Sequence, residues 1–342
     1  MKQLRTKSEE IRKFILDKVE THSSDITKLT AQHFGLTRQA INKHLQNLVK
    51  EKSLIVSGQT RNKHFKLAPL LDWQEGYIIT PLIAEDLVWR NRIKSVLGEM
   101  PDNVIEIWHY GFTEMLNNVI DHSAASHVSI QIEKTAKNTK MIIADDGVGI
   151  FKKIQASLNL IDESHALFEL SKGKLTTDPK NHSGEGIFFT SRMFDSFDII
   201  SGGVHFSHEF KSEEDWVLEG MGSEGTTIVM KLNNHTVRKV KKVFDQFTTD
   251  KNYGFNKTII PVKLALYGND RLISRSQAKR LVARIELFKI VIFDFQGVDT
   301  IGQAFADEIF RVFANLNPTI ELLTIHTNLN VLQMINRAKT KI

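Results

Sequence analysis

The sequence predicts a multidomain α+β protein in which three modules follow one another. Residues 1–70 combine helical apolar spacing with a short hairpin pattern, and residues 110–235 mix helices and strands around glycine-rich turns. Residues 250–342 alternate strands with helices, which is typical of a small α/β sheet. Residues 71–109 contain a helical run and are predicted to be a helical connector. A length of 342 residues suits two or three domains.

The composition narrows the classes of protein to consider. The hydrophobic fraction of 41% and the charged fraction of 25% are ordinary for a soluble globular protein. No run approaches the roughly 18 apolar residues of a membrane span, and the charged N-terminus lacks the apolar core of a signal peptide. The absence of cysteine excludes disulfides and thiolate zinc sites and is consistent with a cytoplasmic location, which we expect.

The net charge of +5 is concentrated at one end of the chain. Residues 1–70 hold 14 Lys and Arg against 6 Asp and Glu, whereas the rest of the chain holds 31 against 34. A basic module joined to a near-neutral body indicates a polyanionic partner for the first segment alone. A solvated basic face with no partner is the alternative.

The first module has the pattern of two short helices joined by a glycine turn. Gly35 supplies the turn, Thr37 is positioned to cap the second helix, and residues 53–68 alternate like a hairpin around Gly58–Asn62. This arrangement resembles the winged helix-turn-helix family over residues 1–70. The resemblance implies binding to double-stranded DNA, although a protein-docking role is the alternative. The implied DNA contacts, on the second helix and at the wing tip, are Arg38, Gln39, Asn42, Lys43, Asn47, Arg61 and Lys63.

The central module carries four short motifs in order. A helix places a carboxylate and a carboxamide one turn apart, as E-x-x-x-N. A strand then ends in D-x-G-x-G, a G-x-G opens a later helix, and a G-T pair precedes a last strand. Each motif is weak taken singly. The residues concerned are Glu114, Asn118, Asp145, Gly147, Gly149, Gly184, Gly186, Gly225 and Thr226.

The joint order of these motifs resembles the GHKL superfamily of ATPases, and most closely the bacterial regulatory members that include anti-sigma-factor kinases. The resemblance implies the Bergerat-type α/β sandwich with ATP and Mg²⁺ as cofactors. Asn118 would be the protein ligand of Mg²⁺, and Glu114 would orient or deprotonate an attacking group. Asp145 would accept a hydrogen bond from the adenine amino group, supported by Thr226 directly or through water.

The glycines of the motifs would let the backbone approach the nucleotide. Gly147 and Gly149 would let the backbone approach the ligand, and Gly184 and Gly186 would present N–H groups to the phosphates at a helix start. Residues 151–183 occupy the place of the ATP lid in the superfamily.

Three lysines of this lid would bring positive charge near the phosphates, with a solvated loop as the alternative. They are Lys172, Lys174 and Lys180. The roles of Asn117, Asp121 and His122 stay open between lining the pocket and packing.

The last module resembles the STAS family, which contains anti-sigma-factor antagonists. The resemblance depends on Asp299, Thr300 and Gly302 at a strand-to-helix turn. Antagonists usually carry a phosphorylated Ser or Thr immediately before the glycine, where this sequence has Ile301, so phosphorylation of Thr300 stays open. Asp299 is predicted to be the N-cap of the following helix. This module is also a candidate surface for a protein partner.

The three modules together predict a cytoplasmic ATP-binding transcriptional regulator whose DNA binding is controlled by the nucleotide state of the GHKL module. The alternative is an anti-sigma-type protein serine/threonine kinase that acts on a STAS-like target, in cis or in trans. A conventional histidine kinase is disfavoured because His109, the only histidine between residues 70 and 110, lies in the leading helix of the ATP module itself. Slow ATP hydrolysis, phosphoryl transfer and simple binding all remain open, as does homodimerisation.

Overall fold

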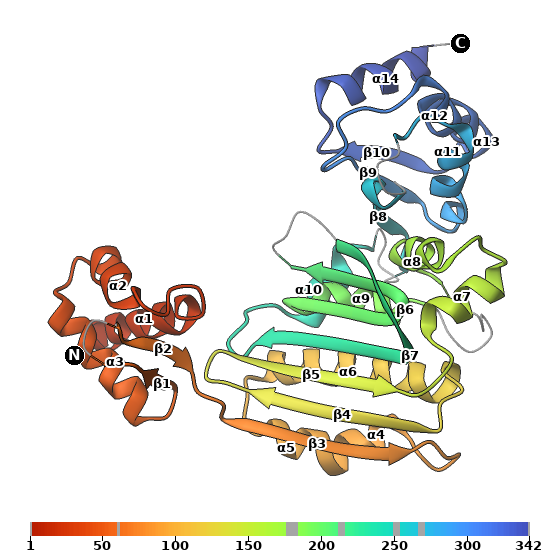
Figure 1. Ribbon diagram of the computed structural model, residues 1–342. Helices are drawn as coiled ribbons and strands as arrows, with labels where there is room; N and C mark the ends of the chain where they lie inside the picture. Colours follow the sequence, from red (N-terminus) through yellow and green to blue (C-terminus); the bar gives the residue numbers. More distant parts are fainter. Residues whose placement is uncertain are drawn as a thin grey trace.

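The computed structural model shows a mixed α/β chain with three separate sheets (Figure 1). It describes residues 2–59, 62–175, 184–210, 216–248, 254–265 and 271–340. None of the helices in these ranges has the length and apolar character needed to cross a bilayer.

The N-terminal module packs three helices against a two-stranded antiparallel hairpin. Its elements are α1 (Lys2–Lys18), α2 (Ile26–Phe34), α3 (Arg38–Lys50), β1 (Leu54–Ser57) and β2 (His64–Leu67). Gly35 ends α2 in the left-handed conformation at φ 63°, which favours glycine. The Thr37 hydroxyl accepts a hydrogen bond from the Ala40 N–H at 3.2 Å, so the predicted cap of α3 is confirmed. Buried residues at helical spacing, such as Ile11, Ile15 and Ile41, form a core separate from the rest of the molecule.

The central module is built on a five-stranded antiparallel sheet in the order β3-β4-β5-β7-β6. Its strands are β3 (Leu71–Ile78), β4 (His127–Lys134), β5 (Asn138–Asp145), β6 (Ser196–Glu209) and β7 (Trp216–Asn233). Its helices are α4 (Glu85–Val88), the π-helix η2 (Trp89–Ile93), α5 (Lys94–Leu97), α6 (Asp102–His122), α7 (Ile150–Leu158), α8 (Glu163–Ser171), α9 (Gly186–Met193) and α10 (Val240–Asp245).

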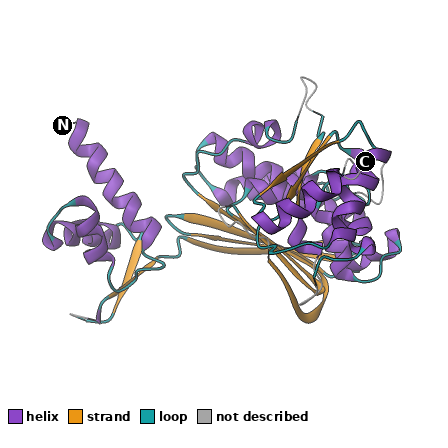
Figure 2. Cartoon of the chain, turned by 90° about the horizontal axis from the view of Figure 1, so that it is seen from above, coloured by secondary structure: helices purple, strands orange, loops and turns teal. Residues whose placement is uncertain are grey.

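The helices cover one face of this sheet, and the N-terminal module lies beyond one end of it (Figure 2). α6 is the main covering element because its buried residues, among them Val104, Trp108 and Phe112, recur every three to four positions. They meet the inward residues of the strands, which alternate in burial along β4 and β5. This packing holds α6 along the sheet, with its last two turns beside the end of β5.

The predicted helical connector was partly wrong. Its first part is β3, which pairs with β4 along its full length in the central sheet. The sequence LDWQEGYI alternates with a period of two: Trp73 and Tyr77 pack against the core, whereas Asp72, Gln74, Gly76 and Ile78 are exposed. The helical run that follows, α4 to α5, agrees with the prediction.

The C-terminal module has a three-stranded parallel sheet in the order β10-β9-β8, as the alternation of strands and helices predicted. Its strands are β8 (Lys257–Pro261), β9 (Ile290–Asp294) and β10 (Glu321–Ile325). Its helical elements are η3 (Val262–Ala265), α11 (Arg275–Val282), η4 (Ile285–Leu287), α12 (Gln303–Asp307), η5 (Glu308–Phe313), α13 (Ala314–Leu316) and α14 (Leu329–Thr340).

One local prediction in this module was wrong. Asp299 does not cap the helix that follows it, because α12 begins at Gln303 and its N-cap is Gly302. Gly302 has an extended backbone, and its N–H donates to the carbonyl of Leu272 at 2.8 Å. The turn is therefore held by backbone pairing with the segment before α11. Asp299 and Thr300 are both exposed.

Candidate functional site

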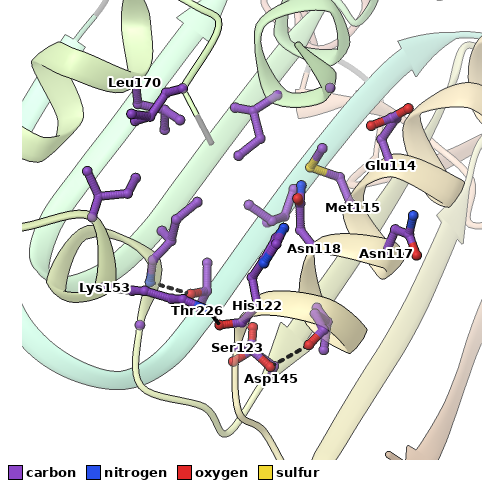
Figure 3. Close-up of a pocket in the computed structure, with 18 of the residues that line it drawn as sticks. Glu114, Met115, Asn117, Asn118, His122, Ser123, Asp145, Lys153, Leu170 and Thr226 are labelled. Atoms are coloured by element: carbon purple, nitrogen blue, oxygen red, sulfur yellow. Dashed lines mark hydrogen bonds between the residues drawn. The ribbon is translucent and has the colours of Figure 1, made fainter. Parts of the chain in front are cut away.

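A cavity of about 300 Å³ lies between α6, the end of β5 and the middle of β7, and α7, α8 and α9 close its other sides. Figure 3 shows part of its lining. The lining residues are Glu114, Met115, Asn117, Asn118, Val119, His122, Ser123, Asp145, Gly149, Ile150, Lys153, Ile154, Leu170, Leu175, Gly184, Gly186, Ile187, Thr226 and Ile228.

α6 supplies a polar stripe to one wall of the cavity. Glu114, Asn118 and His122 follow one another at four-residue intervals and therefore share a face of the helix. Asn118 and His122 point into the cavity opposite Thr226 and Lys153 (Figure 3). Asn117 also belongs to the lining, whereas Asp121 does not. The polar stripe of this half-buried helix thus faces a cavity, while its apolar stripe faces the core.

Glu114 and Asp145 lie at opposite ends of the cavity (Figure 3). At the Glu114 end, the carboxylate packs directly on the first residue of α9. A Cβ at Gly186 would lie 2.0 Å from Glu114 Oε2, so only glycine fits there without moving the carboxylate. This contact brings the start of α9, whose first backbone N–H groups have no partner within the helix, beside Glu114.

Asp145 ends β5 and is nine-tenths buried. Burial raises the pKa of its carboxyl group, and hydrogen bonds from the backbone N–H groups of Gly147 and Thr226 partly oppose that rise. The Gly147 bond measures 2.8 Å to Asp145 Oδ1. The carboxylate is therefore held in place by the two chain segments that flank it, in a partly desolvated position where a hydrogen-bond donor on a ligand would be favoured.

Thr226 lies next to Asp145 and supports it directly, through its backbone N–H and not through its hydroxyl. Thr226 pairs with Asp145 in the register of β5 and β7, and its backbone N–H reaches the carboxylate. Its hydroxyl instead accepts a hydrogen bond from the N–H of Ile150 at 3.0 Å, at the first residue of α7. Thr226 therefore connects the end of β5 to the start of the α7–α8 segment.

The predicted glycines divide into two groups. Gly149, Gly184 and Gly186 line the cavity, and the first two have positive φ, 86° and 70°. Gly147 lies behind the wall, where a Cβ would come within 2.3 Å of the carbonyl oxygen of Ser123. Gly225 has φ 72° and approaches the carbonyl of Asp145 so closely that a Cβ would lie 1.8 Å from it. The last two glycines shape the Asp145 end of the cavity without lining it.

Lys153 is a lining residue that the sequence analysis did not identify. Its ammonium group donates to the carbonyl of His122 at the end of α6. The signal was present in the sequence: α7 starts directly after Gly149, so Ile150, Lys153 and Ile154 share one face of that helix. All three line the cavity, and Lys153 brings a positive charge to it.

The structure places Lys172 and Lys174 away from the cavity. The sequence had suggested instead that both lysines lie near the phosphates of a bound nucleotide. The two lysines follow α8 and turn toward the C-terminal module. Lys172 Nζ donates to Glu169 Oε1 at 2.7 Å and to the carbonyls of Arg280 and Ala283 at 2.9 Å. Lys174 Nζ donates to the carbonyl of Leu287 at 2.9 Å. Lys180 lies outside the described residues.

The segment predicted as a lid is largely helical in its described part, as α7 and α8. Glu185, which precedes α9, has its pKa raised by burial, and Lys174 partly opposes that rise. Burial likewise raises the pKa of Tyr110, with Glu114 and Glu185 adding to the effect. Two carboxylates and a phenol thus lie together beyond the Glu114 end of the cavity.

The predicted DNA contacts lie together on the N-terminal module. The five predicted contacts on α3 are all exposed: Arg38, Gln39, Asn42, Lys43 and Asn47. Lys63, the predicted contact at the hairpin turn that the structure describes, is exposed as well. Their helix buries Ile41, Leu45 and Leu48 on the opposite side. Arg61, the other predicted wing contact, lies outside the described residues.

Comparison with known proteins identifies one part of the chain. Residues 277–332 match the model of a family described as STAS-like domain of unknown function (DUF4325). The C-terminal module is therefore STAS-like, as its sequence had suggested. No curated protein matches the chain.

Proposed function

We propose that this chain is an ATP-binding transcriptional regulator in which the nucleotide state of the central module controls DNA binding by the N-terminal module. One observation carries the proposal. Glu114, Asn118, Asp145, Gly186 and Thr226 come from four separate stretches of the sequence, and all line one cavity.

The arrangement fits a nucleotide along the length of the cavity. The volume of about 300 Å³ lies at the small end of the range for ligand pockets. Asp145 at one end would accept the adenine amino group. At the other end, the N–H groups at the start of α9 would meet the phosphates, which favour helix N-termini.

The chemistry of the donor set also fits magnesium bound jointly with phosphate. Within the described ranges, no three His, Asp or Glu side chains gather so as to hold a metal by themselves. Mg²⁺ commonly takes one or two protein oxygens and completes its shell with phosphate and water. Asn118, in the wall beside Glu114, would supply the amide oxygen.

DNA binding is supported by charge and exposure. The module carries a net +8 within residues 1–70, and its exposed polar residues on α3 are of the types that contact base edges and phosphates. Because such contacts release counterions, affinity for DNA should fall steeply with salt. An interaction insensitive to salt would contradict this part of the proposal.

Two strands offer a route between the cavity and the N-terminal module. β5 ends at Asp145, and Lys137 immediately precedes its first residue. β7 contains Thr226 and, five residues further along, Lys231. Both lysines meet Glu20 just after α1, at 2.6 Å and 3.9 Å. The strands that supply one end of the cavity thus touch the N-terminal module at their other end.

The test measures ATP affinity and DNA affinity in the same full-length protein. Asp145→Asn keeps the shape of the side chain but replaces an acceptor by a group that also donates, so ATP affinity should fall at least tenfold. Asp146→Asn is the matched control, because Asp146 binds the N–H groups of Ser126 and His127 outside the cavity. DNA affinity should then depend on ATP in the wild type and not in Asp145→Asn. Unchanged ATP affinity in Asp145→Asn would overturn the proposal.

A second candidate, a protein serine/threonine kinase of the anti-sigma type, is favoured by the Glu114 carboxylate at the phosphate end and by the STAS-like module. The orientation of that module argues against transfer to its own Thr300. Asn256 and Lys289, at the N-terminal ends of β8 and β9, lie on the side of the central module, whereas Thr300 follows the opposite end of β9. A target in a second chain is therefore favoured.

γ-Labelled ATP separates these activities. Label retained on a STAS-like protein added in trans, and lost with Glu114→Ala, would support the kinase. Free phosphate alone would indicate slow hydrolysis, and ATP binding without turnover would leave a nucleotide-gated switch.

A further inference from the structure

The outer edge of β3 is a free pairing surface. β3 lies at one end of the five-stranded sheet and pairs with β4 alone among the described strands. The opposite end of the sheet, β6, contacts α7, α8 and α9. A row of backbone N–H and C=O groups eight residues long therefore faces outward on β3.

The register identifies which groups these are. Ile79 donates its N–H to the carbonyl of Ser126, its partner in the continued register with β4. Ladder bonds alternate along an antiparallel strand, so odd-numbered residues bond to β4. The N–H and C=O groups of Asp72, Gln74, Gly76 and Ile78 consequently point away from the sheet.

β3 has few of the features that protect an edge strand against pairing. Natural edge strands are commonly guarded by proline, charged residues, above all lysine, or a bulge. The sequence LDWQEGYI contains neither proline nor lysine and pairs with β4 without a register shift; its charged residues are Asp72 and Glu75, and Glu75 is paired with Arg92. Large apolar side chains surround it instead. Leu70 is 48% exposed, Ile78 66% and Leu82 88%. Leu70 immediately precedes β3, Ile78 is its last residue and Leu82 follows it, so both ends of the free edge carry exposed apolar side chains that a second chain could cover.

We propose that β3 pairs in antiparallel fashion with β3 of a second copy of the chain, joining the two sheets into one across a two-fold axis at Gln74. A second copy fits because the strand is complementary to itself. In this register Asp72 faces Gly76 of the second copy, Trp73 faces Glu75, and Gln74 faces Gln74. Seven residues of each strand overlap, and no like charges oppose one another.

Neighbouring registers are worse for stated reasons. Residues opposite one another must lie on the same face of the joined sheet, so the register can shift only in steps of two. A shift in one direction sets Glu75 against Glu75 on the axis, and like charges directly opposite are destabilising. A shift in the other direction shortens the overlap to five residues. The register centred on Gln74 keeps the longest ladder without repulsion.

The pairing has a consequence for DNA binding, and this step alone depends on the proposed function. The N-terminal modules enter the joined sheet at Leu71 of each copy, and six residue steps place these entries roughly 20 Å apart. Modules that extend outward from there can reach half-sites one helical turn, about 34 Å, apart. The two-fold axis then requires an inverted repeat.

The first test is the mass of the full-length protein in solution without nucleotide or DNA, so its outcome does not depend on the proposed function. Light scattering should give a dimer for the wild type and a monomer for Gln74→Pro. Proline at position 74 removes an N–H that faces solvent in the single chain, so β3–β4 pairing is retained. Gln74→Thr, which keeps the N–H, should remain dimeric. A monomeric wild type at tens of micromolar would overturn the proposal.

The second test reads the register and does not need the proline variant to fold. The chain has no cysteine, so a single introduced thiol can pair only with its copy. Hydrogen-bonded residues directly opposite one another have Cα atoms about 5.5 Å apart, within the range of a disulfide. Under mild oxidation Gln74→Cys should crosslink at least tenfold faster than Glu75→Cys. Equal rates, or the reverse order, would overturn the register.

Discussion

The central module meets its two neighbours through junctions of opposite character. The junction with the N-terminal module consists of exposed charged groups, whereas the junction with the STAS-like module consists of buried ones. Each junction contains lysine and glutamate at short distance, so the residue types alone do not distinguish them. What differs is the amount of water around the charges.

The N-terminal junction centres on Lys137, in the turn between β4 and β5. Its ammonium group lies 2.6 Å from Glu20 and donates to the carbonyl of Asp17 at 3.1 Å. The Lys137 and Glu20 side chains are 21% and 40% exposed. Ion pairs of this kind contribute between 0 and about 1 kcal/mol, because water and salt compete for both partners. This junction can open at little cost.

The STAS-like junction centres on Lys172 and Glu169, both 2% exposed. The lysine also binds the last carbonyls of α11, and Arg284 reaches Glu169 at 3.3 Å. Phe188 and Phe255 pack beside it, with ring centroids 4.5 Å apart. Separation would break the hydrogen bonds from Lys172 to both carbonyls and the contact of Glu169 with Arg284, and would expose the packed rings to water, which is costly. Leu170 and Leu175, which flank this junction in the sequence, line the cavity. We therefore expect a structural change at the cavity wall to alter the contacts with the STAS-like module.

The largest effect should come from Glu169→Ala. It leaves Lys172 buried with no carboxylate, which we expect to lower the free energy of unfolding by about 3–5 kcal/mol. Urea unfolding measures this.

The double variant Glu169→Leu with Lys172→Met should recover most of that loss, because apolar replacements often match a buried pair. A loss of less than 1 kcal/mol in the free energy of unfolding of Glu169→Ala would show that the STAS-like junction is held as weakly as the N-terminal junction.

The next effect is a dependence on pH. Burial lowers the pKa of Lys172 to about 8, below its value of 10.5 when exposed. Between these values the unfolded chain holds a proton that the folded chain has released, so the free energy of unfolding rises with pH across this window. The shift corresponds to roughly 3 kcal/mol, at 1.36 kcal/mol per pKa unit. The difference between wild type and Lys172→Met should therefore change from pH 8 to 10.5; a constant difference would contradict the assignment.

A smaller effect is expected from Thr258→Val. The buried Thr258 hydroxyl donates to the carbonyl of Lys172 at 2.7 Å, and valine is similar in shape but leaves that carbonyl without this donor. We expect a loss of about 1–3 kcal/mol in the free energy of unfolding. Thr236→Val is a control, because its hydroxyl makes a longer contact with Arg238, at 3.3 Å. Equal losses in the two variants would contradict the claim that the Thr258 hydrogen bond to the Lys172 carbonyl contributes to stability.

The smallest effect on stability should follow Lys137→Gln. We expect less than 1 kcal/mol, declining further in high salt. Under the proposed function, the same substitution should reduce the influence of ATP on DNA affinity, because it removes a contact between the N-terminal module and the turn before β5. Isothermal titration with DNA, with and without ATP, measures the change. Full retention of that influence would exclude this junction as the route between the two sites.

Much of the candidate site followed from sequence patterns that are local. A helix sets Glu114, Asn118 and His122 on one face wherever it lies, and a strand that ends in D-x-G places Asp145 beside a tight turn. Lys153 could have been found by the same reasoning, since α7 begins at a glycine. β3 was missed because eight alternating residues were read together with the helical run that follows them.

The sequence by itself determined the order of the three modules, the basic character of the first, the strand–helix alternation of the last, and the local sets of polar residues. Only the tertiary structure decided which lysines face the cavity. Lys172 follows α8 in a segment that is rich in charge and reads as a solvated lid. Its environment is set by the carbonyls of Arg280 and Ala283, 108 and 111 residues away in the chain. The protonation, exposure and partners of a side chain depend on what packs over it, and no local pattern contains that information.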